Sequence, residues 1–267
     1  MQISTLSGIA AIALYFVSTL LQGQRLRARQ QSNSPMQATF LIGLLAVIAH
    51  GISASGVIYN ADGYHFGIVQ ISTLIFAAIC LIVLASSIRK PFGALVVGLF
   101  PLAILSIATS LLVETNYPPQ NIGGGIAVHV LLSILAYSIF TIAALQACLL
   151  AFQNYQLKHK HAASVIKRFP PLQDMETFLF ELLWIGQALL TLGIIGGVIF
   201  VQDLSENGLA HKTFFSVVAW IVFAVLLWGR HKLGWRGKTA IRFTLSGFAL
   251  LILGFYGSKF ALEYILS

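Results

Sequence analysis

The segment spanning residues 121–155 constrains the fold of this chain more than any other part of the sequence. It holds about thirty residues without an acidic or basic charge, whereas about 20 apolar residues are enough for a helix to cross the hydrocarbon core of a bilayer. His129 lies near the start of this segment, at a depth where an ionisable side chain is costly and usually functional. The segment therefore predicts a transmembrane helix that carries a polar group.

The composition extends this prediction to the whole chain. Of the 267 residues, 58% are hydrophobic and only 9% are charged, whereas soluble domains carry about 25% charged residues. The connections between apolar runs are short, so residues 1–267 are predicted to form a single transmembrane domain without a soluble domain. The net charge of +8 comes from basic residues in loops, which indicates membrane topology rather than a nucleic-acid partner.

Eight apolar runs predict an all-α, polytopic membrane protein built as a bundle of eight transmembrane helices. The runs cover residues 3–21, 36–57, 67–86, 92–113, 121–155, 177–201, 213–228 and 240–257. Pro101 predicts a kink in the fourth run. A short surface helix is predicted over residues 162–166 in the longest polar connection.

The distribution of basic residues predicts the orientation of the bundle. With an external N-terminus, 14 of the 16 lysines and arginines fall on the inner side, and only Lys212 and Lys259 fall outside. The 14 are Arg25, Arg27, Arg29, Arg89, Lys90, Lys158, Lys160, Lys167, Arg168, Arg230, Lys232, Arg236, Lys238 and Arg242. Because short inner loops are enriched in Lys and Arg, both termini are predicted to be external, which means periplasmic in a bacterial inner membrane.

Four histidines fall on the external side of this topology. His65 and His211 are predicted to lie in loops, whereas His50 and His129 lie about seven residues, or ~10 Å, below the outer ends of their helices. Two imidazoles at matched depth could ligate one haem iron from opposite sides. Each could instead be a neutral histidine hydrogen-bonded to a neighbouring helix, with the matched depth a coincidence.

Other polar and small residues favour structural roles. Gly186, Gly193 and Gly197 form a face of small residues that predicts close helix packing. Glu181 and the nearby Asp174 and Glu176 fall at the inner end of their helix, where a structural ion pair with Arg230 or Arg236 is predicted. Cys80 and Cys148 each stand alone in an apolar run and are predicted to be small buried residues.

The sequence contains no nucleophile–base pair, P-loop or zinc motif, so no catalytic residue is identified. The helix interiors carry almost no charge, which disfavours a proton-coupled transporter or an ion channel.

The chain resembles the cytochrome c assembly protein family, whose members include the CcsA and HemX types. The likeness is carried by the segments AVIAHG and HVLLSILAYSIF, and by PPLQDMETFLFELLWIGQALLTLGIIGGVIF and SGFALLILGFYGSK further along the chain. The most specific match is G-W-R-G at positions 234–237, preceded by Trp220 and Arg230 at the family's offsets. The resemblance spans nearly the full length.

This resemblance implies haem as cofactor and several site residues. In the family, a tryptophan-rich external motif ending in W-D-P-K contacts haem, and histidines ligate it. His129 matches the external histidine that precedes this motif, and Lys212 matches its lysine. Ala210 and His211 replace the aspartate and proline, the tryptophans of the motif are missing, and Trp228 stands where the family has an intramembrane histidine.

The sequence therefore predicts a membrane protein that binds or hands on haem in cytochrome c biogenesis. His50 and His129 are the predicted iron ligands. The residues predicted near the haem propionates are His65, His211 or Lys212. The lipid bilayer and haem are the predicted partners, with other membrane proteins as further ones. The alternative is a haem-free accessory subunit that contacts a partner protein through the glycine face and the basic inner loops.

Overall fold

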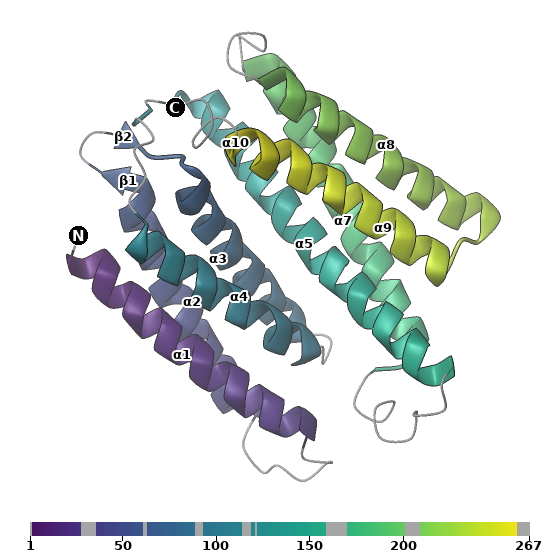
Figure 1. Cartoon of the computed structure of the whole chain (residues 1–267), viewed down its shortest axis with the longest axis horizontal. Coiled ribbons are helices and arrows are strands. Elements are labelled where there is room, and N and C mark those ends of the chain that lie inside the picture. The colour runs from purple at the N-terminus through teal and green to yellow at the C-terminus, as the bar shows by residue number, and fades with distance from the viewer. Residues whose placement is uncertain are drawn as a thin grey trace. The chain divides into compact units, whose positions relative to one another are not determined.

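The computed structural model is almost entirely helical, as the apolar runs predict (Figure 1). It describes residues 2–27, 36–60, 63–88, 93–113, 119–120, 122–158, 170–200 and 209–260. Within these residues, eight helices are long and apolar enough to cross a membrane. The prediction of an eight-span all-α membrane protein is thus confirmed, whereas the external placement of both termini and the single domain stay predictions.

The chain forms two compact units. Unit 1 contains α1 (Gln2–Arg27), α2 (Met36–Ile58), α3 (Ile68–Ser87) and α4 (Gly93–Leu112). A two-residue hairpin, β1 (Tyr59–Asn60) and β2 (Gly63–Tyr64), joins α2 to α3. Unit 2 contains α5 (Gly124–Lys158), α7 (Leu172–Phe200), α8 (Leu209–Leu233), α9 (Lys238–Ile252), the π-helix η2 (Leu253–Gly257) and α10 (Ser258–Phe260).

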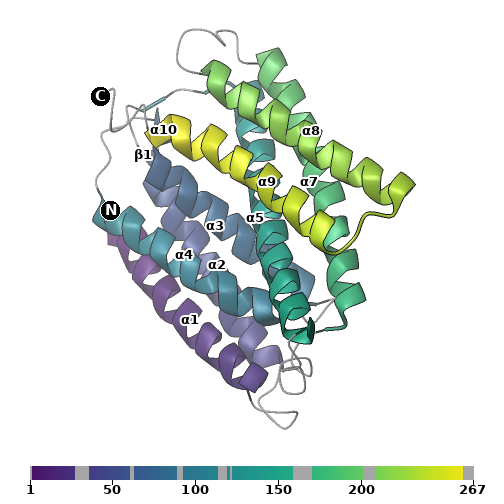
Figure 2. The same cartoon turned by 45° about the vertical axis from the view of Figure 1, so that its right-hand side comes forward.

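In unit 1, α1 packs against α2 and α4, and α3 packs against α2 and α4 (Figures 1 and 2). The core is built from large side chains such as Tyr15, Ile79, Leu99 and Phe100, all of which are fully buried. Pro101 lies inside α4 and does not end it. Leucines and isoleucines on the outer faces of these helices are exposed, as expected of surfaces that contact lipid.

In unit 2, α5 packs against α7 and α9, and α8 packs against α7 and α9 (Figure 2). The rings of Phe140 on α5 and Phe223 on α8 stack in the core, with centroids 4.1 Å apart. Cys80 of unit 1 is buried as predicted, but Cys148 on α5 is exposed, because it lies on the outer face of a helix whose opposite face meets α7. The prediction for Cys148 was therefore wrong.

The boundaries of α8 correct a second prediction. The apolar run predicts a helix from residue 213, with His211 in the preceding loop, but α8 begins at Leu209. His211 and Lys212 thus belong to its first turn. His159, His161 and the surface helix predicted over residues 162–166 lie outside the described residues.

Candidate functional site

His50 occupies the polar centre of unit 1. Its ring is fully buried and both ring nitrogens are hydrogen-bonded: Nδ1 lies 3.3 Å from the hydroxyl of Tyr15, and Nε2 lies 2.9 Å from the hydroxyl of Thr73. A neutral imidazole donates through one nitrogen and accepts through the other, and a hydroxyl can serve either role. His50 therefore joins α1, α2 and α3 as a fully satisfied core histidine.

Packing fixes the orientation of this group. The ring of Tyr15 meets His50 edge-on at 5.7 Å and meets Phe100 of α4 edge-on at 4.8 Å. Edge-to-face contacts of this kind are favourable, because the positive edge of one ring faces the negative face of the other. Tyr15 is held between two helices, and its hydroxyl is aimed at the imidazole.

Substitution of Thr73 by valine is expected to lower the free energy of unfolding by about 1–3 kcal/mol, because Nε2 of buried His50 loses its partner. Denaturant unfolding of the purified protein in micelles measures the change. Thr109→Val is the matched control, because the exposed Thr109 hydroxyl bonds only to the carbonyl of Leu105 one turn away. Equal effects of the two substitutions would contradict a structural role for the Thr73 bond.

His129 is held differently, on the α5–α7 contact of unit 2. Its Nδ1 lies 2.8 Å from the backbone carbonyl of Gly193. Because a carbonyl can only accept, Nδ1 carries the proton and donates it, so Nε2 keeps its lone pair in the neutral ring. A backbone bond to one ring nitrogen is how proteins fix the tautomer of a histidine that ligates a metal through the other nitrogen.

The glycines of α7 form the seat of this ring. A β-carbon at Gly197 would lie 3.0 Å from Cε1 of His129, and one at Gly196 would lie 3.6 Å from its Cβ. Any larger residue at position 197 would therefore displace the imidazole. The sequence identified Gly193 and Gly197 as a packing face, but it could not show that His129 is what packs there.

The same face continues along the two helices. A β-carbon at Gly186 would meet the ring of Phe140 at 2.9 Å, and one at Gly193 would approach the hydroxyl of Ser133 at 3.6 Å. From Gly186 to Gly193 the chain advances seven residues, and from Phe140 to Ser133 it retreats seven, so α5 and α7 run antiparallel in close contact. The predicted role in helix packing is confirmed, and α5 covers the face that the accessory-subunit alternative assigned to a partner.

Lys212 lies where α8 contacts η2. A β-carbon at Gly254 of η2 would lie 2.7 Å from Cβ of Phe215 and 3.7 Å from the carbonyl oxygen of Lys212. Leu251 lies two residues before the π-helical turn η2. Its backbone carbonyl accepts a hydrogen bond from the hydroxyl of Tyr137 at 3.0 Å. π-Helical turns within α-helices occur frequently at functional sites.

Lys259 is a residue that sequence reasoning missed. It was predicted only as an external cation, but it is buried in α10, directly after η2. A buried lysine is uncommon, because its charge must leave water. Only the burial reveals it, since nothing in the local sequence separates it from a solvated lysine.

The G-W-R-G segment forms the turn between α8 and α9. Gly234 and Gly237 have φ of +67° and +53°, where side chains other than that of glycine are strained. The ring of Trp235 covers Gly229, whose missing side chain makes room for it. The turn thus directs Arg236 toward α7.

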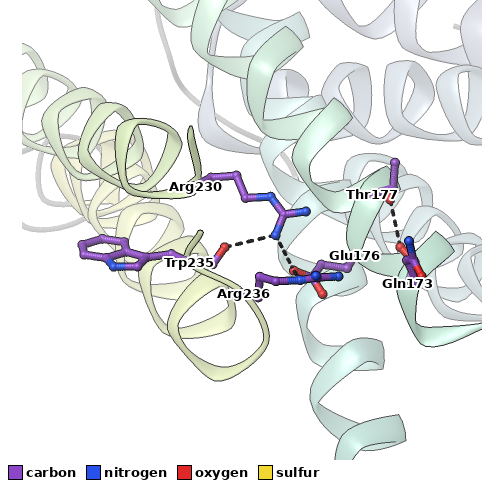
Figure 3. Close-up of polar contacts among 6 residues, drawn as sticks. All are labelled: Gln173, Glu176, Thr177, Arg230, Trp235 and Arg236. Atoms are coloured by element: carbon purple, nitrogen blue, oxygen red, sulfur yellow. Dashed lines mark hydrogen bonds and ion pairs between the residues drawn. The ribbon is translucent and has the colours of Figure 1, made fainter. Parts of the chain in front are cut away.

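The carboxylate of Glu176 on α7 forms ion pairs with two arginines near this turn (Figure 3). Its Oε1 lies 3.0 Å from Nη1 of Arg230 and 3.2 Å from Nε of Arg236, and Arg230 also donates to the carbonyl of Trp235. The guanidinium of Arg230 further lies 4.5 Å from the ring centre of Phe180. Of the three carboxylates considered in the sequence, Glu176 forms the predicted ion pair, and it pairs with both arginines rather than one.

No group of three or more His, Cys, Asp or Glu side chains converges to hold a metal ion within the part of the chain that the structure describes. His50 has its partners in unit 1, and His129 has its partner in unit 2.

The sequence is similar to those of several known membrane and cytochrome c biogenesis proteins. The chain is 28% identical to the inner membrane protein YpjD of Escherichia coli K12 over 239 residues, which cover 88% of this chain and 90% of that protein. It is 21% identical to the cytochrome c biogenesis protein CcsA of Prochlorococcus marinus over 60% of each chain, and 26% identical to the protein HemX of Brevibacillus brevis over 48% of each. No solved structure matches.

The sequence profile described as Cytochrome C assembly protein matches residues 38–266, which include all the transmembrane helices except α1. The apolar helices and the likeness to YpjD make the protein a multi-pass inner membrane protein. Because the match covers well over half of the sequence, the chain belongs to the cytochrome c assembly protein family.

Proposed function

We propose that this protein binds haem during cytochrome c assembly, and that His129 would hold the iron as a ligand. The observation that carries the proposal is the hydrogen bond from Nδ1 of His129 to the carbonyl of Gly193, which leaves Nε2 with a lone pair. Membership of the cytochrome c assembly family supports the same cofactor.

The residues around His129 fit this role. Neutral imidazole is a suitable ligand for iron, and the backbone bond fixes the orientation of the ring. The seat formed by Gly193, Gly196 and Gly197 restricts the ring, so less ordering is needed on binding. Bound haem supplies an iron centre capable of electron transfer, and the chain supplies ligand, orientation and shielding from water.

His50 is proposed as an iron ligand within unit 1. Both of its nitrogens are hydrogen-bonded, so iron would have to replace Tyr15 or Thr73 as a partner. Thr73 is the partner that Nε2 would give up. The hydroxyl of Tyr15 would then remain on Nδ1 and orient the ring, as a hydrogen-bonding partner of a metal-bound histidine does.

His211 and Lys212 are proposed to contact the haem propionates from the first turn of α8. A helix N-terminus favours negative charge, and a lysine there adds a charge-assisted hydrogen bond. The proposal assigns no catalytic residue to this chain, because the tryptophan-rich motif is missing from it.

Haem titration of the purified apoprotein in detergent tests the proposal. The wild type is expected to give a Soret band, and His129→Gly is expected to lose at least about tenfold in haem affinity, because the imidazole that would bind the iron is gone. Addition of free imidazole is expected to restore the band in His129→Gly, which a variant that had merely unfolded would not show.

His231→Gly is the matched control, because His231 is an exposed histidine of the same unit. A Soret band unchanged by His129→Gly would overturn the assignment of the ligand. Absence of the band from the wild type would overturn haem binding itself and leave the haem-free accessory role. His50→Gly, with the same imidazole rescue, tests the ligand of unit 1 separately.

A further inference from the structure

The end of unit 2 at which α8 ends and α9 begins carries a dense group of cations. This basic cluster consists of Arg230, Lys232, Arg236, Lys238 and Arg242. All but Arg230 are exposed, and the glycine turn at 234–237 joins the two helices that carry them. Lys238 and Arg242 are four residues apart, so they lie on the same face of α9.

The carboxylates at this end do not neutralise the basic cluster. Glu176 is already shared by Arg230 and Arg236, and its side chain is only 6% exposed. Asp174 and Glu181 are exposed on α7, so the described residues of α7, α8 and α9 at this end supply three carboxylates against five cations. Arg236 is 56% exposed and uses only Nε on Glu176, so its two Nη groups have no hydrogen bond to any described residue.

An apolar strip leads along α8 to the basic cluster. Ile221, Val225, Trp228 and Lys232 are spaced four, three and four residues apart, which places them on one face of the helix, and all four are exposed. Trp228, the most exposed of the apolar three at 58%, stands one turn before Lys232. Tryptophan is enriched where hydrocarbon meets headgroups, and lysine extends from there toward the phosphates.

From this arrangement we propose that the basic cluster is a binding site for an anionic phospholipid. The headgroup phosphate contacts Lys232, Lys238, Arg242 and the outward Nη groups of Arg236, and an acyl chain lies along the strip from Trp228 to Ile221. Cation and apolar surface are continuous on one helix, which suits an amphiphile better than a free anion or an acidic protein segment.

Quenching of tryptophan fluorescence by brominated lipids tests this site directly. All four tryptophans, Trp184, Trp220, Trp228 and Trp235, lie in unit 2, so the signal reports this unit alone. The full-length protein is reconstituted in phosphatidylcholine vesicles that contain a small fixed fraction of brominated phosphatidylglycerol or of brominated phosphatidylcholine. The relative association constant is expected to favour phosphatidylglycerol by at least about fivefold, the factor that one near-surface cation provides.

The triple variant Lys232→Gln, Lys238→Gln, Arg242→Gln is expected to abolish this preference while keeping its helical circular dichroism. Lys158→Gln is the matched control, because it removes an exposed cation from the end of α5 and should retain the preference. At about 1 M salt, where the Debye length is about 3 Å, the preference of the wild type should shrink.

Three results would overturn the proposal. Equal quenching of the wild type by both brominated lipids would show that the surface does not select anionic lipid. A preference that survives in the triple variant would place the lipid elsewhere. Loss of the preference on addition of inorganic phosphate, at constant ionic strength, would show that the cluster takes the free anion instead of the lipid.

Discussion

Replacement of Glu176 by glutamine is expected to lower the free energy of unfolding by about 3 kcal/mol, near the lower end of the range for breaking a buried ion pair. Oε1 of Glu176 accepts hydrogen bonds from both Arg230 and Arg236. Without the carboxylate, Arg230, whose side chain is 29% exposed, keeps its charge in a half-buried position. The Trp235 carbonyl and the Phe180 ring are then its remaining partners among the described residues. The partial exposure of both arginines limits the loss.

Denaturant unfolding in mixed micelles measures this change, and Asp174→Asn provides the matched control. Asp174 lies in the first turn of the same helix but is exposed, so its neutralisation should cost less than about 0.5 kcal/mol. The double variant Glu176→Gln, Arg230→Met should lose less than the sum of its single changes, because it removes the unpaired charge. Equal losses for Glu176→Gln and Asp174→Asn would contradict the role of this carboxylate.

Leucine in place of Gly186 is expected to destabilise unit 2 by about 3 kcal/mol, the upper part of the usual range for overpacking. A β-carbon there would already lie 2.9 Å from Cζ of Phe140 and 3.2 Å from Cγ2 of Ile139. Phe140 cannot move aside easily, because its ring is fully buried and stacked on Phe223. The helices α5 and α7 would have to separate.

Gly51→Leu is the matched control for this substitution. Gly51 also lies within a transmembrane helix, but no heavy atom outside its own turn of α2 lies within 4 Å of the position of its β-carbon. Leucine there faces open space and should leave stability unchanged or slightly improved. Thermal unfolding in detergent, followed by circular dichroism, compares the two variants. If Gly186→Leu unfolded at the same temperature as the wild type, close packing of α5 against α7 at Gly186 would be contradicted.

Within the candidate site, the sequence identified the residues but not their partners. His129 was predicted as an intramembrane imidazole, yet its partner Gly193 lies 64 residues further along the chain. His50 was predicted as an iron ligand or a hydrogen-bonded core residue, and its bonds to Tyr15 and Thr73 come from two other helices. Such pairings depend on which faces of distant helices are in contact, and the hydropathy of a local segment does not predict these contacts.

The sequence by itself determined that the chain is a helical membrane protein with eight spans, because hydrophobic runs long enough to cross a bilayer are a local property. Opposite charges at one end of neighbouring helices also predicted an ion pair between an acidic residue of α7 and Arg230 or Arg236, and the structure identified Glu176 as that residue. Only the tertiary structure decided that the glycines of α7 receive His129, that α8 begins before His211, and that Lys259 is buried. The contact of His129 with the glycines and the burial of Lys259 follow from packing between segments far apart in the chain, where the shape of one surface selects what fits against it.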